Sequence, residues 1–118
     1  MLIRHLALTV RDPDASRDFY LRTIGLDGEA TDEPWGVRVK FADGFMFALI
    51  QGDPPAANAV GAVHFGCALS SRADARDLRE RLRGAGVTEL EWEDEGGYTG
   101  VKVQDPDGYV VELAYDEA

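Results

Sequence analysis

Three side chains of the types that bind metal ions lie at matched places in this sequence. The chain contains two histidines, His5 and His64, and each lies in a short stretch that alternates apolar and polar residues. Glu112 interrupts a third, otherwise apolar stretch near the C-terminus. Alternation with a period of two is typical of a half-buried strand, so all three side chains should lie on the face away from the core. Their neighbours on that face are small residues: Ala7, Gly66, Ala68 and Ala114.

The chemistry of this set has two interpretations. Two imidazoles and one carboxylate that converge in a concave sheet are the ligands that bind Fe(II), Mn(II), Zn(II) or Ni(II) and leave coordination positions open for water or substrate. The alternative is that a histidine in a strand is an ordinary polar residue with its hydrogen bonds satisfied, and that a carboxylate near the end of a chain is solvated. The pattern alone leaves both interpretations open.

The segments that would position these side chains occur twice in the sequence. Residues 36–49, GVRVKFADGFMFAL, align without a gap to residues 100–113, GVKVQDPDGYVVEL, at an offset of 64. The opening strand and the helix after it repeat at an offset of 59, which aligns the two histidines with each other. In the longer alignment Glu112 corresponds to Ala48, so only the second copy carries the carboxylate. Matched strand, helix and turn positions indicate an internal duplication.

Each copy predicts the element order βαβββ, and the fold class is therefore α+β. The first half should contain a strand at 2–10, a helix from Asp12 and Pro13 to about Ile24, and strands near 26–32, 35–42 and 45–51. The second half should contain a strand at 61–69, a helix near 72–84, and strands near 88–94, 98–104 and 109–115. We expect Asp43-Gly44 to form a tight turn, and Gly25 to end the first helix.

Particular side chains should face the core of each half. On the opening strand these are Leu2, Leu6, Leu8 and Val10. On the two helices they are Ala15, Phe19 and Ile24, and then Leu78 and Leu82. Because 118 residues suffice for one compact core and are too few for two ordinary domains, we expect residues 1–118 to form a single domain. Its half-modules would span about 1–52 and 61–118, joined by a linker at 53–60.

Composition excludes some classes of partner. The formal net charge of −10 argues against nucleic acid, whose binding needs clustered Lys and Arg. No apolar run reaches the length of a membrane span, and the N-terminus shows no charged-then-apolar leader, so we expect a protein of the cytoplasm with no membrane partner. The single cysteine, Cys67, cannot form an internal disulfide, and its place on the apolar face of a strand favours a buried, inert thiol.

Five further residues are candidates for substrate contacts. Arg38 and Lys102 occupy equivalent positions of the repeat and would hold an anionic substrate, or they are ordinary solvated residues. Tyr98 has the same strand parity as Lys102 and could donate a hydrogen bond to a substrate or an oxyanion, which would make it catalytic. Trp35 and Trp92 are either platforms for a ligand or contacts of the core or of a dimer.

The opening HLALTVRDPDASRDFYLRTIGL, the later HFGCAL and the closing DPDGYVVEL resemble the vicinal oxygen chelate superfamily over essentially the whole chain. This superfamily includes glyoxalase I, extradiol dioxygenases, and the fosfomycin- and bleomycin-resistance proteins. The resemblance implies two tandem βαβββ modules that form a cupped mixed β-sheet. It also implies that His5, His64 and Glu112 bind a divalent ion, Zn, Ni, Mn or Fe. It further implies a homodimer with inter-subunit sites, in which the first-half ligand comes from one subunit and the second-half ligands from the other.

One departure from the family narrows the implied function. Glyoxalase I carries a fourth ligand at or near the position of Ala48, and the nearest polar candidate, Gln51, should point to the opposite face of the strand. The resemblance implies a metal-dependent, glyoxalase-like lyase, isomerase or resistance-type transferase that acts on a small oxygen-chelating substrate, with Glu112 as a catalytic residue. The alternative is a metal-free, bleomycin-resistance-like protein that binds and sequesters an aromatic or cationic compound.

Overall fold

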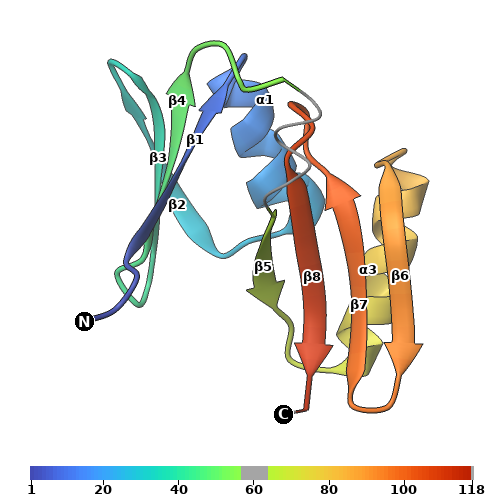
Figure 1. Cartoon of the computed structure of the whole chain (residues 1–118). Helices are drawn as coiled ribbons and strands as arrows, with labels where there is room; N and C mark the ends of the chain where they lie inside the picture. The colour runs from blue at the N-terminus through green and yellow to red at the C-terminus, as the bar shows by residue number, and fades with distance from the viewer. Residues whose placement is uncertain (57–63, 118) are drawn as a thin grey trace. The chain divides into compact units, whose positions relative to one another are not determined.

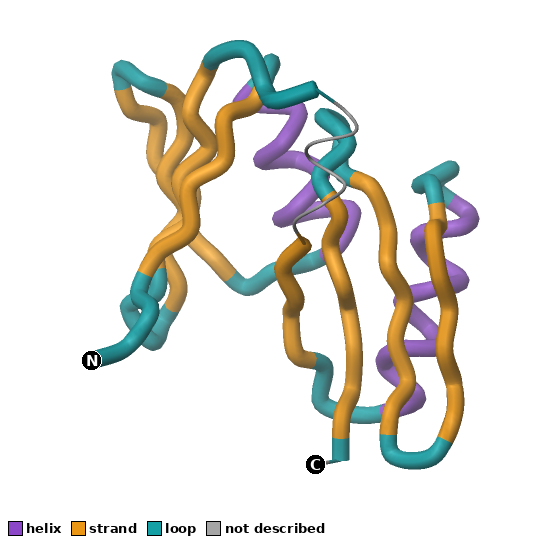
Figure 2. Tube along the Cα trace, viewed as in Figure 1, coloured by secondary structure: helices purple, strands orange, loops and turns teal. Residues whose placement is uncertain are grey.

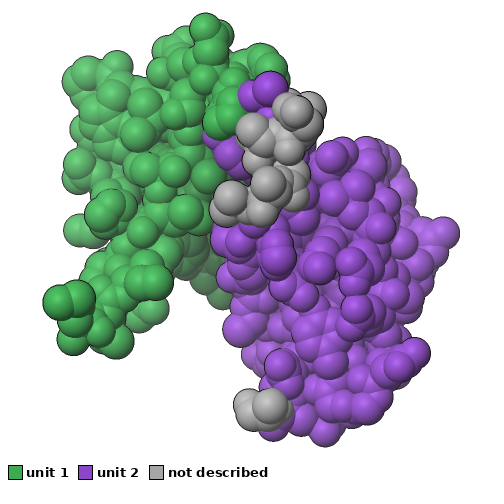
Figure 3. Space-filling model, viewed as in Figure 1, with its two compact units in different colours: residues 1–55 green, residues 56–118 purple. Residues whose placement is uncertain are grey.

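The computed structural model describes residues 1–56 and 64–117, and the chain divides into two compact units, Met1–Pro55 and Ala56–Ala118 (Figure 3). The second half of the predicted linker, residues 57–60, and the first residues of the predicted strand at 61–69 lie outside the described part. None of the helices in the described part combines the length and the apolar character that a membrane crossing requires.

The first unit consists of a helical segment and a four-stranded sheet. Its elements are β1 (His5–Val10), α1 (Pro13–Asp18), η1 (Phe19–Ile24), β2 (Gly28–Glu33), β3 (Gly36–Phe41) and β4 (Met46–Gln51). The strands follow the order β1-β4-β3-β2, with β1 parallel to β4 and the other neighbours antiparallel (Figure 1).

The second unit repeats this plan. Its elements are β5 (His64–Ala68), α3 (Arg72–Gly84), β6 (Glu89–Glu95), β7 (Tyr98–Gln104) and β8 (Val110–Asp116). The strand order is β5-β8-β7-β6, with β5 parallel to β8 (Figure 2). The predicted α+β fold of two βαβββ modules is therefore confirmed.

The duplication extends to single hydrogen bonds. In the turn before β4 the amide of Gly44 donates to the carbonyl of Phe41 at 2.9 Å, and in the turn before β8 the amide of Gly108 donates to the carbonyl of Asp105 at 3.0 Å. Gly44 and Gly108 adopt φ angles of 88° and 92°, which side chains other than glycine rarely tolerate. Strand register agrees, since Ala7 pairs with Ala48 in the first unit and the equivalent Gly66 pairs with Glu112 in the second.

Each helix covers the apolar face of its own sheet. Leu78 and Leu82 of α3 are buried, as predicted, and α3 packs on β7 and β8 (Figure 1). Arg76 and Thr99 both donate to the carboxylate of Asp94, which ties α3 to the β6–β7 hairpin and, through Arg76 first, lowers the pKa of Asp94. The opposite, polar face of this sheet carries the candidate site.

Two predicted core positions of the first unit were wrong. Ala15 is exposed, and the inward face of the helical segment instead carries Ser16, Tyr20 and Ile24 together with Phe19. The helix changes to π winding at Phe19, and the amide of Gly25 bonds to the carbonyl of Tyr20, five residues back, at 3.2 Å. The buried Ser16, Tyr20 and Ile24 follow one another at intervals of four, so the inward stripe passes through Ser16 and leaves Ala15 outside it. Leu2 is 76% exposed because β1 begins only at His5.

Candidate functional site

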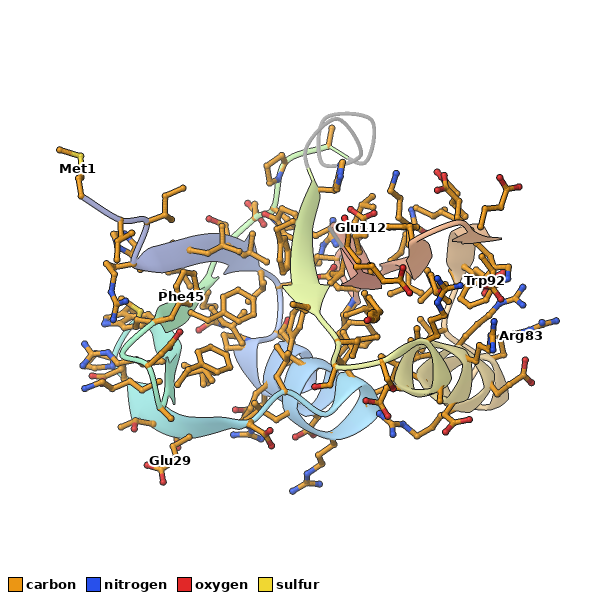
Figure 4. The ribbon with its side chains drawn as sticks, turned by 90° about the horizontal axis from the view of Figure 1, so that it is seen from below. Met1, Glu29, Phe45, Arg83, Trp92 and Glu112 are labelled. Carbon is orange, nitrogen blue, oxygen red and sulfur yellow. The ribbon has the colours of Figure 1, made fainter. Side chains whose placement is uncertain are left out.

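The sheet of the second unit presents a polar face on the side away from α3. Glu112 of β8 lies on this face in Figure 4, while Trp92 of β6 lies toward the helix. Gly66 of β5 pairs directly with Glu112, and His64 is two residues from Gly66, so the imidazole shares the face of the carboxylate. The exposed and half-buried residues alternate along β5 as this geometry requires.

His64 and Glu112 contact each other. His64 Nε2 lies 3.5 Å from Glu112 Oε2, and the two side chains are 47% and 25% exposed. The structure thus brings together two of the three predicted metal ligands. The small side chain of Ala68 and the absence of one at Gly66 leave this part of the sheet open in front of both groups.

Tyr98 reaches Glu112 along the sheet. Its hydroxyl donates a hydrogen bond to Glu112 Oε1, the carboxylate oxygen that does not face His64. Burial raises the pKa of Tyr98, and the bonded carboxylate raises it further. The phenol is therefore a hydrogen-bond donor at neutral pH.

Lys102 pairs in register with Glu112, but its ammonium group turns to the neighbouring strand. Lys102 Nζ lies 3.3 Å from Glu91 Oε2 of β6. A hydrogen bond from Glu93, together with Lys102, lowers the pKa of Glu91, while the same contact between the carboxyl groups raises the pKa of Glu93. The charged groups next to Glu112 thus include both acidic and basic side chains. The prediction that Lys102 contacts a substrate did not anticipate its ion pair with Glu91.

The first unit contains three more of the predicted residues, His5, Arg38 and Trp35. His5 begins β1 and is exposed. Arg38 pairs in register with Ala48, its Nη1 lies 3.7 Å from Glu33 Oε1, and its guanidinium stands 5.9 Å from the ring of Trp35. Arg38 Nε is buried and has no hydrogen-bond partner among the described residues.

Three other residues lie away from this polar face. Trp92 pairs in register with the buried Val101 and stacks under Arg79 at 4.5 Å, so it does not join Glu112. Gln51 lies at the exposed end of β4 and has the parity of the buried Leu49, opposite to that of Ala48. Burial raises the pKa of the Cys67 thiol, in agreement with its expected inertness.

Comparisons with known proteins agree with this architecture. The family model of the Glyoxalase/Bleomycin resistance protein/Dioxygenase superfamily matches residues 2–113. The chain belongs to this superfamily. The resemblance to the vicinal oxygen chelate proteins is thereby confirmed.

Individual relatives are similar over nearly their full length. An uncharacterized protein of Pseudomonas aeruginosa is 34% identical, over 98% of this chain and 89% of the relative. The structure of a possible glyoxalase from Bacillus cereus is 26% identical with a TM-score of 0.75, covering 96% of this chain and 97% of that one. A glyoxalase/dioxygenase from Nostoc punctiforme shares the fold with a TM-score of 0.81 at 20% identity, covering 99% of this chain and 92% of the other.

Members of this superfamily typically use divalent metals, and the His64–Glu112 pair fits such an ion. Two ligand atoms bound about 2.0–2.2 Å from one tetrahedral ion stand about 3.4 Å apart. The 3.5 Å between His64 Nε2 and Glu112 Oε2 agrees with that spacing. Within residues 1–56 and 64–117, no three His, Cys, Asp or Glu side chains form a group that could hold a metal ion. Two of the three predicted ligands thus lie in the second unit, and the third, His5, belongs to the first unit.

One residue of the site was missed by the sequence interpretation. Gly100 lies in the interior of β7 beneath the ring of Tyr98, and a Cβ there would stand 2.6 Å from the Tyr98 hydroxyl oxygen. The sequence did contain a signal, since a glycine inside a strand often marks the close approach of another group.

Proposed function

We propose that this chain is a divalent-metal-dependent, glyoxalase-like enzyme that acts on a small substrate with adjacent oxygen atoms. The observation that supports the proposal best is the approach of His64 Nε2 to Glu112 Oε2 on an open sheet face bordered by Gly66. An imidazole nitrogen and a carboxylate oxygen suit Zn(II), Ni(II), Mn(II) or Fe(II). Such an ion, when bound, acts as a Lewis acid that polarises a substrate oxygen.

The residues of the second unit have separate roles in this proposal. His64 and Glu112 hold the ion, and the Glu112 carboxylate also takes and returns a substrate proton, since the chain's other histidine, His5, is itself a proposed ligand. Tyr98 fixes the orientation of Glu112 through its hydrogen bond. Lys102 lies on the same face and offers a positive charge to an anionic part of the substrate, in competition with Glu91. Proton transfer next to a polarised carbonyl is the chemistry of a lyase or isomerase, and a resistance-type transferase would use the same metal.

His5 is the proposed third ligand. It aligns with His64 at the repeat offset, begins its strand in the same way and is exposed. We propose a homodimer in which the partner's His5 completes the ligand set of His64 and Glu112. The symmetry of the duplication supports this assignment, because each half then contributes its opening histidine to a metal.

Metal content tests the proposal directly. Protein purified without chelators or metal-affinity columns should carry about one divalent ion per chain in elemental analysis, and His64→Ala and Glu112→Ala should each abolish it. Glu95→Gln is the matched control, because it removes a carboxylate from the same face of the sheet at the exposed end of β6. A metal content that stays at the wild-type value in either ligand variant would overturn the assignment.

Mixed dimers test the origin of His5. A His5→Ala chain paired with a Glu112→Ala chain would gather both defects in one inter-subunit site and leave the other site intact. The purified heterodimer should therefore bind about half as much metal as the wild type, while each parental homodimer has two damaged sites. A heterodimer that binds no more than its parents contradicts the exchange of ligands between subunits.

A second candidate function draws support from the acidic character of the same face. The face that carries Glu112 also carries three glutamates of β6, Glu91, Glu93 and Glu95, because they pair in register with Lys102, Gly100 and Tyr98. Lys102 lies between Glu91 and Glu112 in this register. Such a surface suits a cationic compound held without a metal. This binding-protein alternative replaces the enzyme if the metal-free protein binds an organic cation in calorimetry and the purified protein contains no divalent ion.

A further inference from the structure

Gly100 provides the space that the phenol of Tyr98 occupies. Both residues lie on β7 with the same parity, and the Tyr98 side chain leans along the strand over Gly100 toward Glu112. A Cβ at position 100 would stand 2.6 Å from the Tyr98 hydroxyl oxygen, 2.8 Å from Tyr98 Cζ and 2.8 Å from Ala114 Cβ. Distances under 3.0 Å are ones that real Cβ atoms essentially never show, so any side chain here would displace the ring.

Backbone conformation does not explain this glycine. Gly100 is absent from the residues with positive φ in the described chain, so an alanine could adopt its dihedral angles. Its counterpart in the first unit, Gly36, has a φ of 149°, and a Cβ there would stand 2.0 Å from the backbone oxygen of Leu49. The repeat thus keeps a glycine at both places for different reasons: backbone crowding at Gly36, and the neighbouring side chains at Gly100.

The duplication separates this arrangement from the general fold. At the repeat offset of 64, Tyr98 corresponds to Pro34 and Glu112 corresponds to Ala48. The second half has both the phenol and the carboxylate, whereas the first half has neither. The pairing indicates that Tyr98 acts on Glu112.

We propose that Gly100 and Tyr98 form a positioning pair that binds one oxygen of Glu112 and leaves the other as its single metal-binding atom. Tyr98 donates to Oε1, and Oε2 faces His64 at 3.5 Å. Hydrogen bonds of this kind orient metal-ligating carboxylates. With Oε1 engaged, Glu112 presents one oxygen instead of two, so a coordination position remains for the second oxygen of the substrate. This inference rests on the proposed metal function, but the Tyr98–Glu112 contact does not.

The contact is tested first in the metal-free protein. The carboxyl carbon of Glu112 is identified in the ¹³C spectrum of glutamate-labelled protein by its loss in Glu112→Gln. Tyr98→Phe and Gly100→Ala should both shift this resonance. Gly84→Ala is the matched control: it adds the same methyl group at the end of α3, where nothing lies within 4 Å of the new Cβ, and it should leave the resonance in place.

Metal binding is tested second, by zinc titration against a chromophoric chelator. Tyr98→Phe and Gly100→Ala should each weaken zinc binding by about 10–100-fold, the range for lost partners of metal ligands. Gly84→Ala should stay within about twofold. Because Gly100 acts through the phenol, Gly100→Ala should weaken zinc binding no further in a Tyr98→Phe background. X-ray absorption spectra of the zinc-loaded Tyr98→Phe protein should show one more oxygen neighbour than the wild type.

The outcomes separate the two proposals. If Glu112→Gln abolishes zinc binding while Tyr98→Phe and Gly100→Ala bind like the wild type, the positioning pair is refuted and the metal site stands. Zinc affinity that is unchanged in Glu112→Gln refutes the metal site and with it the metal-presenting role of Tyr98. In that case the ¹³C spectra of the metal-free protein decide whether Gly100 and Tyr98 orient Glu112. If Tyr98→Phe does not shift the Glu112 resonance, this orienting role is refuted as well.

Discussion

Restoring the missing carboxylate of the first half, by Ala48→Glu, should create an ion pair with Arg38. The two positions are directly paired across β3 and β4, where opposite side chains stand about 4.5–5.5 Å apart at their Cβ atoms. Arg38 Nε is buried without a described partner, and the nearest carboxylate, Glu33, lies 3.7 Å from Nη1, beyond hydrogen-bond distance. A carboxylate at position 48 would therefore meet an available donor.

The magnitude follows from the burial of the site. Ala48 is 5% exposed, so the longer side chain should cost about 1–3 kcal/mol in the free energy of unfolding through overpacking alone. A hydrogen bond to a charged group returns about 1.5–3 kcal/mol. In an Arg38→Met background that return is lost, and Ala48→Glu should become about 2 kcal/mol more destabilising than it is in the wild type.

Urea unfolding of the four proteins of this double-mutant cycle measures the coupling. All are compared at one protein concentration, because dimer formation would make the midpoint depend on it. Ala48→Gln supplies the control, with nearly the same volume and no charge, and its coupling to Arg38 should be below about 1 kcal/mol. If the effects of Ala48→Glu and Arg38→Met add to within about 0.5 kcal/mol, the two side chains do not interact and the reasoning from register fails.

Three further predictions concern the second unit. The hydrogen bond from Arg79 lowers the pKa of Glu89, so this pair stabilises the fold fully above the unfolded-state pKa near 4.3 and loses its effect as the pH falls through the lower folded-state value. The urea midpoint should therefore drop on acidification below about pH 4, and drop less in Arg79→Met; an equal drop contradicts the assignment. Burial raises the pKa of Cys67, so iodoacetamide at pH 8 should alkylate the folded protein at least about tenfold more slowly than the urea-unfolded chain, and equal rates would show an accessible thiolate. Leu82→Ala should cost about 2–5 kcal/mol in urea unfolding because Leu82 is 2% exposed, and a loss below about 1 kcal/mol would mean that the helix face repacks.

The sequence predicts those parts of the fold that local signals determine. The bounds of α3 match the predicted 72–84, because Ser71 caps the helix by accepting from the amide of Asp74 at 3.1 Å and the apolar spacing persists to Leu82. The helical segment of the first unit was harder to predict from the sequence. Its inward stripe begins at Ser16, a polar residue, so apolar spacing alone placed Ala15 on the wrong face.

The candidate site could be predicted in part for a similar reason. A period of two along a strand determines which face a side chain takes, and it placed His64 and Glu112 together correctly. It does not determine which residues become neighbours across strands. The bond of Tyr98 to Glu112, the turn of Lys102 toward Glu91 and the space over Gly100 all depend on register and rotamer.

The two halves show how one architecture can carry two different polar faces. Arg38 and Lys102 are equivalent cations, and each has as its register partner the position that holds Ala48 in one half and Glu112 in the other. Lys102, next to a carboxylate that Tyr98 already binds, pairs with Glu91 instead. Arg38, next to a methyl group, keeps a buried donor without a described partner. Since β3 pairs with β4 as β7 pairs with β8, the difference at these paired positions arises from the side chains they hold, and Ala48→Glu should make the first face resemble the second.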